Sequence, residues 1–148
     1  MAQPSKTQIV RHLLMRLMMG FTLGWFGGLQ VRSQGDWVDF VPDFISRLSP
    51  VDDSYLIFLH GSLLLLAAVG IFLGLRFVAA SLLAVILLSF IIFALIVDGG
   101  SVNLIVRDIG ILGLAIGLVF DPVRFWQLDT VQRLSWRKIR IGKGKFQT

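Results

Sequence analysis

The longest apolar stretch of the chain runs from Tyr55 to Val97, and within it only His60 and Arg76 can carry a charge. Arg76 lies in the middle, with twenty-one residues on either side. At about 1.5 Å per residue, each half forms a helix of about 31 Å, which matches the thickness of a bilayer's hydrocarbon core. The pattern therefore predicts a hairpin of two membrane-crossing helices whose tip is Gly74-Leu75-Arg76.

Two further apolar segments flank this hairpin. Leu13 to Val31 is interrupted by Arg16, and Leu104 to Phe120 follows a turn-like sequence at 98–103. Asp121-Pro122 ends the last segment, because a proline disfavours helix in the residue before it. We predict an all-α membrane protein, a four-transmembrane-helix bundle over residues 13–120. Its helices are expected at about 13–31, 55–74, 77–97 and 104–120.

The outer loop, residues 32–54, carries an amphipathic pattern of its own. Apolar side chains recur at helical spacing, although Pro42 should break or start a helix there. The sequence predicts a short interfacial helix from about Val41 to Leu48, with Trp37 as an anchor at the membrane surface. A cap packed over the helix bundle is the alternative, and the two interpretations are not mutually exclusive.

The composition agrees with a membrane protein and limits its chemistry. Of 148 residues, 55% are hydrophobic and 16% charged, with a mean hydropathy of +0.80. The sequence contains no cysteine, which excludes disulfides, thiol relays, iron–sulfur clusters and covalently attached c-type haem. His12 and His60 should lie at different depths, so they cannot jointly hold a metal or haem. We expect no metal site, no cofactor held within the chain and no stand-alone catalytic constellation.

The distribution of charge predicts the orientation. Basic residues gather in the N-terminal segment 1–12, at Arg76 and in the tail 121–148, whereas the outer loop carries five aspartates against two arginines. The positive-inside rule then places both termini in the cytoplasm, and we expect the membrane to be a bacterial cytoplasmic membrane. The tail is expected to lie on anionic headgroups through Arg133, Arg137, Lys138, Arg140, Lys143 and Lys145. A docking arm on a partner protein is the alternative, and nucleic acid is not expected.

Small residues form one stripe on each predicted helix, and such stripes pack membrane helices together. The glycines expected to pack are Gly20, Gly24, Gly27, Gly70, Gly74, Gly110, Gly113 and Gly117. Ala80, Ala84 and Ala94 form the stripe of the third helix, in line with Asp98.

Polar residues in the outer parts of the helices are the candidate site. His60 and Asp98 fall on the small-residue faces and should point inward. Ionisable groups at membrane depth cost free energy unless they are paired, so Arg107 should balance Asp98 or Asp108. With Gln30, these residues form a hypothetical ligand-binding cluster; a purely structural cluster is the alternative. Asp108 falls about 170° from the glycine stripe of its helix. Either this helix is packed against neighbours on both faces, or the Asp108 side chain extends to the lipid headgroups.

Arg16 is interpreted separately from this cluster. It lies near the inner end of the first helix, where a long cationic side chain can extend to the headgroups. We therefore expect Arg16 to anchor the helix at the membrane surface.

The chain resembles the DoxX-like membrane proteins over about residues 13–120. The likeness is carried by Arg16 to Gly20, Gly27-Gly28, Gly70 to Arg76 with Ala79-Ala80, and Asn103 to Gly113. The resemblance implies a four-helix bundle associated with membrane redox assemblies. Family members often carry a Glu in the second helix, where this chain has His60 as its one ionisable side chain before the Arg76 turn.

The expected function is that of an integral membrane subunit of, or adjacent to, an electron-transfer complex. It would line a quinone or small-anion pocket at the outer mouth of the bundle, with other membrane subunits as partners. A non-catalytic accessory subunit that docks onto a larger complex is the first alternative, and a small-solute carrier is the second.

Overall fold

The computed structural model describes residues 5–121, which form helices, turns and loops without a β-strand. The elements are α1 (Lys6–Arg32), the 3-10 helix η1 (Gln34–Phe40), α2 (Asp43–Leu48), α3 (Asp53–Leu73), α4 (Phe77–Val97) and α5 (Val102–Val119). The basic tail residues, including Arg133 and Lys145, lie outside the described residues. Of the described helices, α3, α4 and α5 are each long and apolar enough to cross a membrane.

The helix boundaries follow from local capping. The Ser5 side chain accepts a hydrogen bond from the Gln8 backbone N–H, and the Gln8 side chain accepts one from the Ser5 N–H. This capping box starts α1 at Lys6, so residues 6–12 are helical, whereas the sequence interpretation began the helix at Leu13. Asp52 caps α3 by accepting from the Ser54 N–H.

The tight turn between α3 and α4 uses two residues in the left-handed region. Gly74 ends α3 with φ 73°, and Arg76 precedes α4 with φ 43°. Glycine adopts this conformation without steric cost, so Gly74 serves the turn rather than the helix packing predicted for it.

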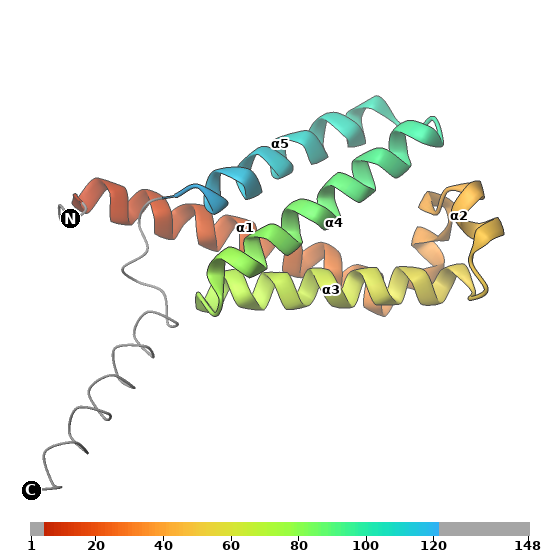
Figure 1. The fold of residues 1–148 in the computed structure, drawn as a ribbon, viewed down its shortest axis with the longest axis horizontal. Coiled ribbons are helices and arrows are strands. Elements are labelled where there is room, and N and C mark those ends of the chain that lie inside the picture. The colour runs from red at the N-terminus through yellow and green to blue at the C-terminus, as the bar shows by residue number, and fades with distance from the viewer. Residues whose placement is uncertain (1–4, 122–148) are drawn as a thin grey trace, which may run out of the picture.

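Two helix pairs build the bundle. Figure 1 shows α1 against α3 and α4 against α5, with α3 and α4 joined through the Gly74 turn. The two pairs converge at the end that carries this turn, which we call the turn end, and diverge toward the end that carries η1 and α2, the loop end. At the turn end α5 returns to α1, where the Met15 side chain approaches Gly117.

Glycines allow α1 and α3 to approach closely. A Cβ atom at Gly27 would lie 2.8 Å from the Gly61 carbonyl oxygen, and one at Gly61 would lie 2.7 Å from the Gln30 Cβ. Gly20 packs on Phe72, and Gly70 packs on Ala80 at the α3–α4 contact. By contrast, a Cβ at Gly110 or Gly113 would meet no atom of residues 5–121 within 4 Å, so these two glycines do not pack against another of the described helices.

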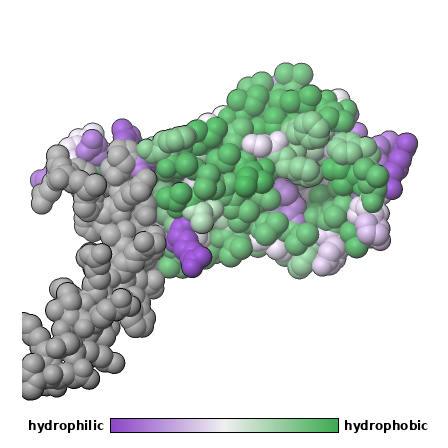
Figure 2. Space-filling model, viewed as in Figure 1, coloured by the Kyte–Doolittle hydropathy of each residue, from purple (hydrophilic) through white to green (hydrophobic). Residues whose placement is uncertain are grey.

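The polarity of α1 is inverted relative to a helix in water. His12, Arg16 and Gln30 are buried, whereas Phe21 and Trp25 are each more than half exposed. Figure 2 shows that the visible face of the molecule is broadly apolar, with hydrophilic residues mainly toward its two ends. Such a surface is typical of helices that face lipid and turn their polar groups toward the bundle.

Arg16 does not extend to the surface, which corrects the interpretation from sequence. Its side chain is 6% exposed; Nε donates to the Ile71 carbonyl at 3.1 Å, and Nη2 donates to the Phe72 carbonyl at 3.0 Å. The guanidinium also lies over the Phe77 ring, 5.5 Å from its centroid. Arg16 therefore donates to two carbonyl groups in the last turn of α3, where carbonyls lack the regular helical donors. The Ile71 carbonyl also accepts from the Gly74 N–H at 3.3 Å.

Candidate functional site

A cavity of about 590 Å³ lies between the two helix pairs toward the loop end. Its walls come from α1, α3, α4 and α5, and η1 with the start of α2 covers it. The wall is mostly apolar, and its polar side chains are Thr22, Gln30, Ser33, Asp36, His60, Arg107 and Asp108. A concave, apolar space of this size with a few convergent polar groups is the usual form of a small-molecule site.

Gln30 and His60 meet across the closest α1–α3 contact. The His60 Nδ1–H donates to the Gln30 side-chain oxygen at 2.8 Å, with the tautomer set by this acceptor. The contact exists because Gly27 and Gly61 bring the two helices together one turn away from Gln30. His60 Nε2 is buried and makes no hydrogen bond to residues 5–121. The backbone of Leu87 lies near the ring, outside hydrogen-bond geometry.

Arg107 and Asp108 pair with one another on α5. Arg107 Nε donates to Asp108 Oδ1 at 2.8 Å, and the Arg107 guanidinium lies 4.8 Å from the centroid of the Phe26 ring. The Asp108 side chain is only 5% exposed, whereas that of Arg107 is 42% exposed. The pair thus joins α5 to α1 by a cation–π contact and keeps a buried carboxylate neutralised.

The structure brings together four of the five residues predicted for the cluster: Gln30, His60, Arg107 and Asp108 line one cavity. Asp98 does not join them, and the expectation that it points inward is wrong. It is exposed at the C-terminal end of α4 and is absent from the cavity wall, although Ala94 one turn earlier lines it. The reason is the divergence of α4 from α3, which carries the last turn of α4 away from the other pair (Figure 1).

The aromatic cover of the cavity comes from residues that sequence reasoning did not assign to the site. Trp37 of η1 stacks edge-on against Phe26 of α1, with centroids 6.2 Å apart, and contacts Phe40 at 5.8 Å. Outside the cavity wall, Phe44 of α2 packs edge-on against Phe93 of α4, with ring centroids 6.4 Å apart. The helical spacing of apolar residues in the outer loop was the signal that could have identified this cover. In the structure, apolar side chains of that loop pack over the loop end of the bundle.

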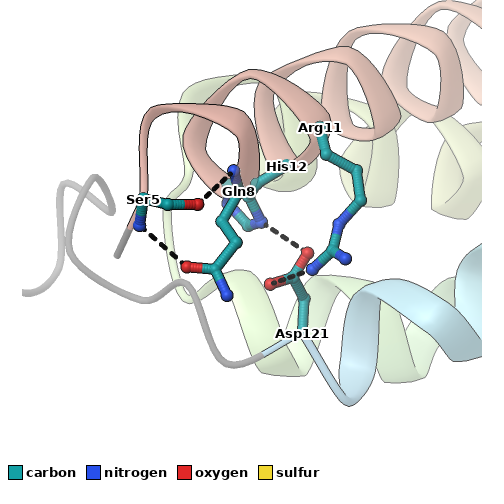
Figure 3. A network of polar contacts seen from close by, with 5 residues as sticks. All are labelled: Ser5, Gln8, Arg11, His12 and Asp121. Carbon is teal, nitrogen blue, oxygen red and sulfur yellow. Dashed lines mark hydrogen bonds and ion pairs between the residues drawn. The ribbon is translucent and has the colours of Figure 1, made fainter. Parts of the chain in front are cut away.

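A second polar cluster closes the turn end (Figure 3). His12 Nδ1 lies 3.2 Å from Asp121 Oδ2, although not in hydrogen-bond geometry, and Arg11 lies 4.0 Å from the same carboxylate. The His12 and Asp121 side chains are each 2% exposed. Since His12 and Gln30 lie eighteen residues apart on α1, His12 is about 27 Å from the cavity's polar end. The two histidines thus belong to separate clusters.

No group of three or more His, Asp or Glu side chains within residues 5–121 is arranged to hold a metal ion. A scan of protein-family models and searches of curated proteins and of solved structures find no match to this chain. The resemblance of residues 13–120 to the DoxX-like family therefore stays a prediction from sequence.

Replacing Arg107 by leucine is expected to lower the free energy of unfolding by about 1–3 kcal/mol, because buried Asp108 loses its partner. The double variant Arg107→Leu/Asp108→Leu should recover part of this loss, since it removes the unpaired charge as well. Thermal unfolding in mild detergent measures both. A double variant less stable than Arg107→Leu would contradict a role of Arg107 in neutralising Asp108.

Proposed function

We propose that this chain is a four-crossing integral membrane protein, with α1 as a crossing helix beside α3, α4 and α5. The inverted polarity of α1 supports the fourth crossing: its apolar side chains face outward, while His12, Arg16 and Gln30 face the bundle. Lys6, Arg11 and Arg76 are then cytoplasmic at the turn end, and the acidic outer loop faces the opposite side. In this arrangement η1 and α2 lie at the non-cytoplasmic surface of the membrane.

We further propose that the bundle provides a small-molecule pocket within, or beside, a membrane electron-transfer complex. The observation that carries this proposal is the cavity of about 590 Å³, apolar except where Gln30, His60, Arg107 and Asp108 converge. A quinone head group or a small anion are the occupants suggested by these groups. Arg107, whose side chain is partly exposed, is placed to donate to a carbonyl oxygen or an anion.

Different residues of the chain would bind different parts of a quinone. Arg107 donates hydrogen bonds to the head group, Asp108 and Phe26 fix the guanidinium, and Trp37 covers the ring from the loop end. A bound quinone would supply the reversible electron acceptance that the side chains themselves lack. Gln30 fixes the orientation of the His60 ring, and His60 would then help to orient the head group at the polar end of the pocket.

Gentle detergent extraction followed by mass spectrometry of co-purifying chains and bound quinone tests this proposal. We expect quinone and at least one further membrane subunit to accompany the wild-type protein, and His60→Leu and Arg107→Leu to lose the quinone at matched folded yield. A protein purified alone and empty would contradict the proposal.

An accessory, non-catalytic subunit is the second candidate, and the outer face of α5 favours it. A Cβ at Gly110 or Gly113 would meet no atom of the described residues within 4 Å, and small residues allow close contact with a helix of another subunit. Exposed Phe21 and Trp25 on α1 add aromatic surface on the bundle. Cross-links from these residues to a larger subunit, with an empty cavity, would favour this function.

A carrier is less well supported by the geometry. A transport path must reach both membrane faces, yet the turn end is packed by Met19, Ile71 and Phe77, each at most 1% exposed. The cavity therefore ends within the bundle.

A further inference from the structure

We infer that the cavity takes an uncharged, lipid-soluble molecule with a hydrogen-bonding head group, which enters from the bilayer between α3 and α4, rather than a small anion from water. This inference rests on the proposed pocket and decides which class of ligand it accepts. Three properties of the cavity lead to it: its charge, the cover over its aqueous side and the exposure of its side wall.

The charged groups around the cavity do not favour an anion. Arg107 is the cation in the described lining, and Asp108 already neutralises it at 2.8 Å. Asp36 adds a further negative charge, so even a protonated His60 would bring the lining only to neutrality. A desolvated anion would thus gain no net opposite charge, and burial of such a charge is costly.

The aqueous approach is both covered and acidic. Trp37, Phe40 and Ile45 line the cavity from η1 and α2, between the bundle and the loop-end surface. The outer loop that contains them carries five aspartates against two arginines. An anion that approaches from this side meets a repulsive potential before it meets the aromatic cover.

The side wall, by contrast, is apolar and open between α3 and α4. Leu59 and Phe90 both line the cavity, yet they remain 47% and 49% exposed. Leu59 lies fifteen residues before Gly74 and Phe90 fourteen after Arg76, so the two side chains stand at nearly the same depth. On the opposite side, between α1 and α5, the wall carries the Arg107–Asp108 pair and Phe26. A lipid-soluble molecule therefore finds its apolar entrance past Leu59 and Phe90.

Tryptophan fluorescence tests the ligand class. The sequence has four tryptophans, and Trp37 lines the cavity whereas Trp25 is exposed on α1 outside it. The probe protein is the full chain in liposomes with Trp37 as its single tryptophan, and the matched control keeps only Trp25. Decylubiquinone, an uncharged quencher, should quench Trp37 saturably and Trp25 only in proportion to its concentration in the bilayer. Sulfate in excess should not change the saturable component.

Substitutions at the entrance test the route. In the Trp37-only protein, Leu59→Ala and Phe90→Ala should raise the association and dissociation rates of decylubiquinone severalfold while the dissociation constant stays nearly unchanged. Leu66→Ala and Ile86→Ala, at exposed positions on the same helices outside the cavity wall, serve as controls and should leave both rates unchanged.

The outcomes separate the inference from the proposed function. Competition by sulfate, or saturable binding of sulfate alone, would overturn the uncharged class but leave the pocket in place. Unchanged rates in both entrance variants would overturn the route through α3 and α4. No saturable response to either probe would overturn the pocket and the inference together.

Discussion

Replacing Arg16 by methionine is expected to lower the free energy of unfolding by about 2–4 kcal/mol. Arg16 donates to the Ile71 and Phe72 carbonyls from a side chain only 6% exposed, so its removal leaves carbonyl groups at the end of α3 without these donors. The Ile71 carbonyl would keep the Gly74 N–H as a donor, whereas both carbonyls would lose a charged donor, and a hydrogen bond to a charged group contributes more than a neutral one. Unfolding in mild detergent, followed by circular dichroism, measures the loss.

Two further variants separate this role from a general effect of charge. Arg16→Lys should recover only part of the stability, because an ammonium group cannot reproduce the geometry of the guanidinium against two carbonyls. Arg47→Met removes a cation whose side chain is 80% exposed, and it should change stability by less than about 0.5 kcal/mol. Equal losses at positions 16 and 47 would contradict the capping role of Arg16.

Replacing Gly27 by alanine is expected to lower the free energy of unfolding by about 1–3 kcal/mol through overpacking. The new methyl group would meet the Gly61 carbonyl oxygen at 2.8 Å and the Leu65 backbone nitrogen at 3.0 Å. Both are backbone atoms, which cannot move without shifting α3 as a whole. The same shift should lengthen the hydrogen bond between Gln30 and His60, so ligand binding should weaken with stability.

Gly28 provides the matched control for this prediction. A Cβ there would meet no atom within 4 Å in the described part of the chain, and alanine is the better helix former by about 1 kcal/mol. Gly28→Ala should therefore be neutral or stabilising in the same unfolding measurement. A Gly28→Ala variant that loses as much stability as Gly27→Ala would show that α1 and α3 do not meet along the face assigned here.

The parts of the fold that could be predicted from sequence depend on local signals. The central Arg76 between two apolar halves predicts the α3–α4 hairpin, and α4 has the predicted range 77–97. The glycine stripe of α1 predicts the face that meets α3, because close contact requires small residues at Gly20 and Gly27.

The arrangement of α5 could not be predicted from its small residues. Its stripe at Gly110 and Gly113 contacts no other described helix, while Asp108, about 170° from that stripe, is buried in the cavity wall. The Arg107–Asp108 pair and Phe26, rather than close glycine contact, set the rotation of this helix near the cavity. Such a side-chain network depends on long-range contacts that helix periodicity does not encode.

The same limitation explains the errors at Asp98 and Arg16. Periodicity places Asp98 on the buried face of α4, but α4 has diverged from α3 before that residue is reached. Depth alone suggests a surface anchor at Arg16, but the end of α3 at Gly74 leaves carbonyl groups beside it. Both outcomes depend on where a neighbouring helix ends or diverges.

Cysteine accessibility in sealed vesicles tests the central claim most directly, because the sequence contains no cysteine of its own. Single variants Ser5→Cys, Gln34→Cys and Ser101→Cys place a thiol before α1, after α1 and before α5. With a membrane-impermeant thiol reagent, we expect Ser5→Cys to be labelled from one side only, and Gln34→Cys and Ser101→Cys only from the other. Labelling of Ser5→Cys and Gln34→Cys from the same side would show that α1 does not cross the membrane and would contradict the four-crossing bundle.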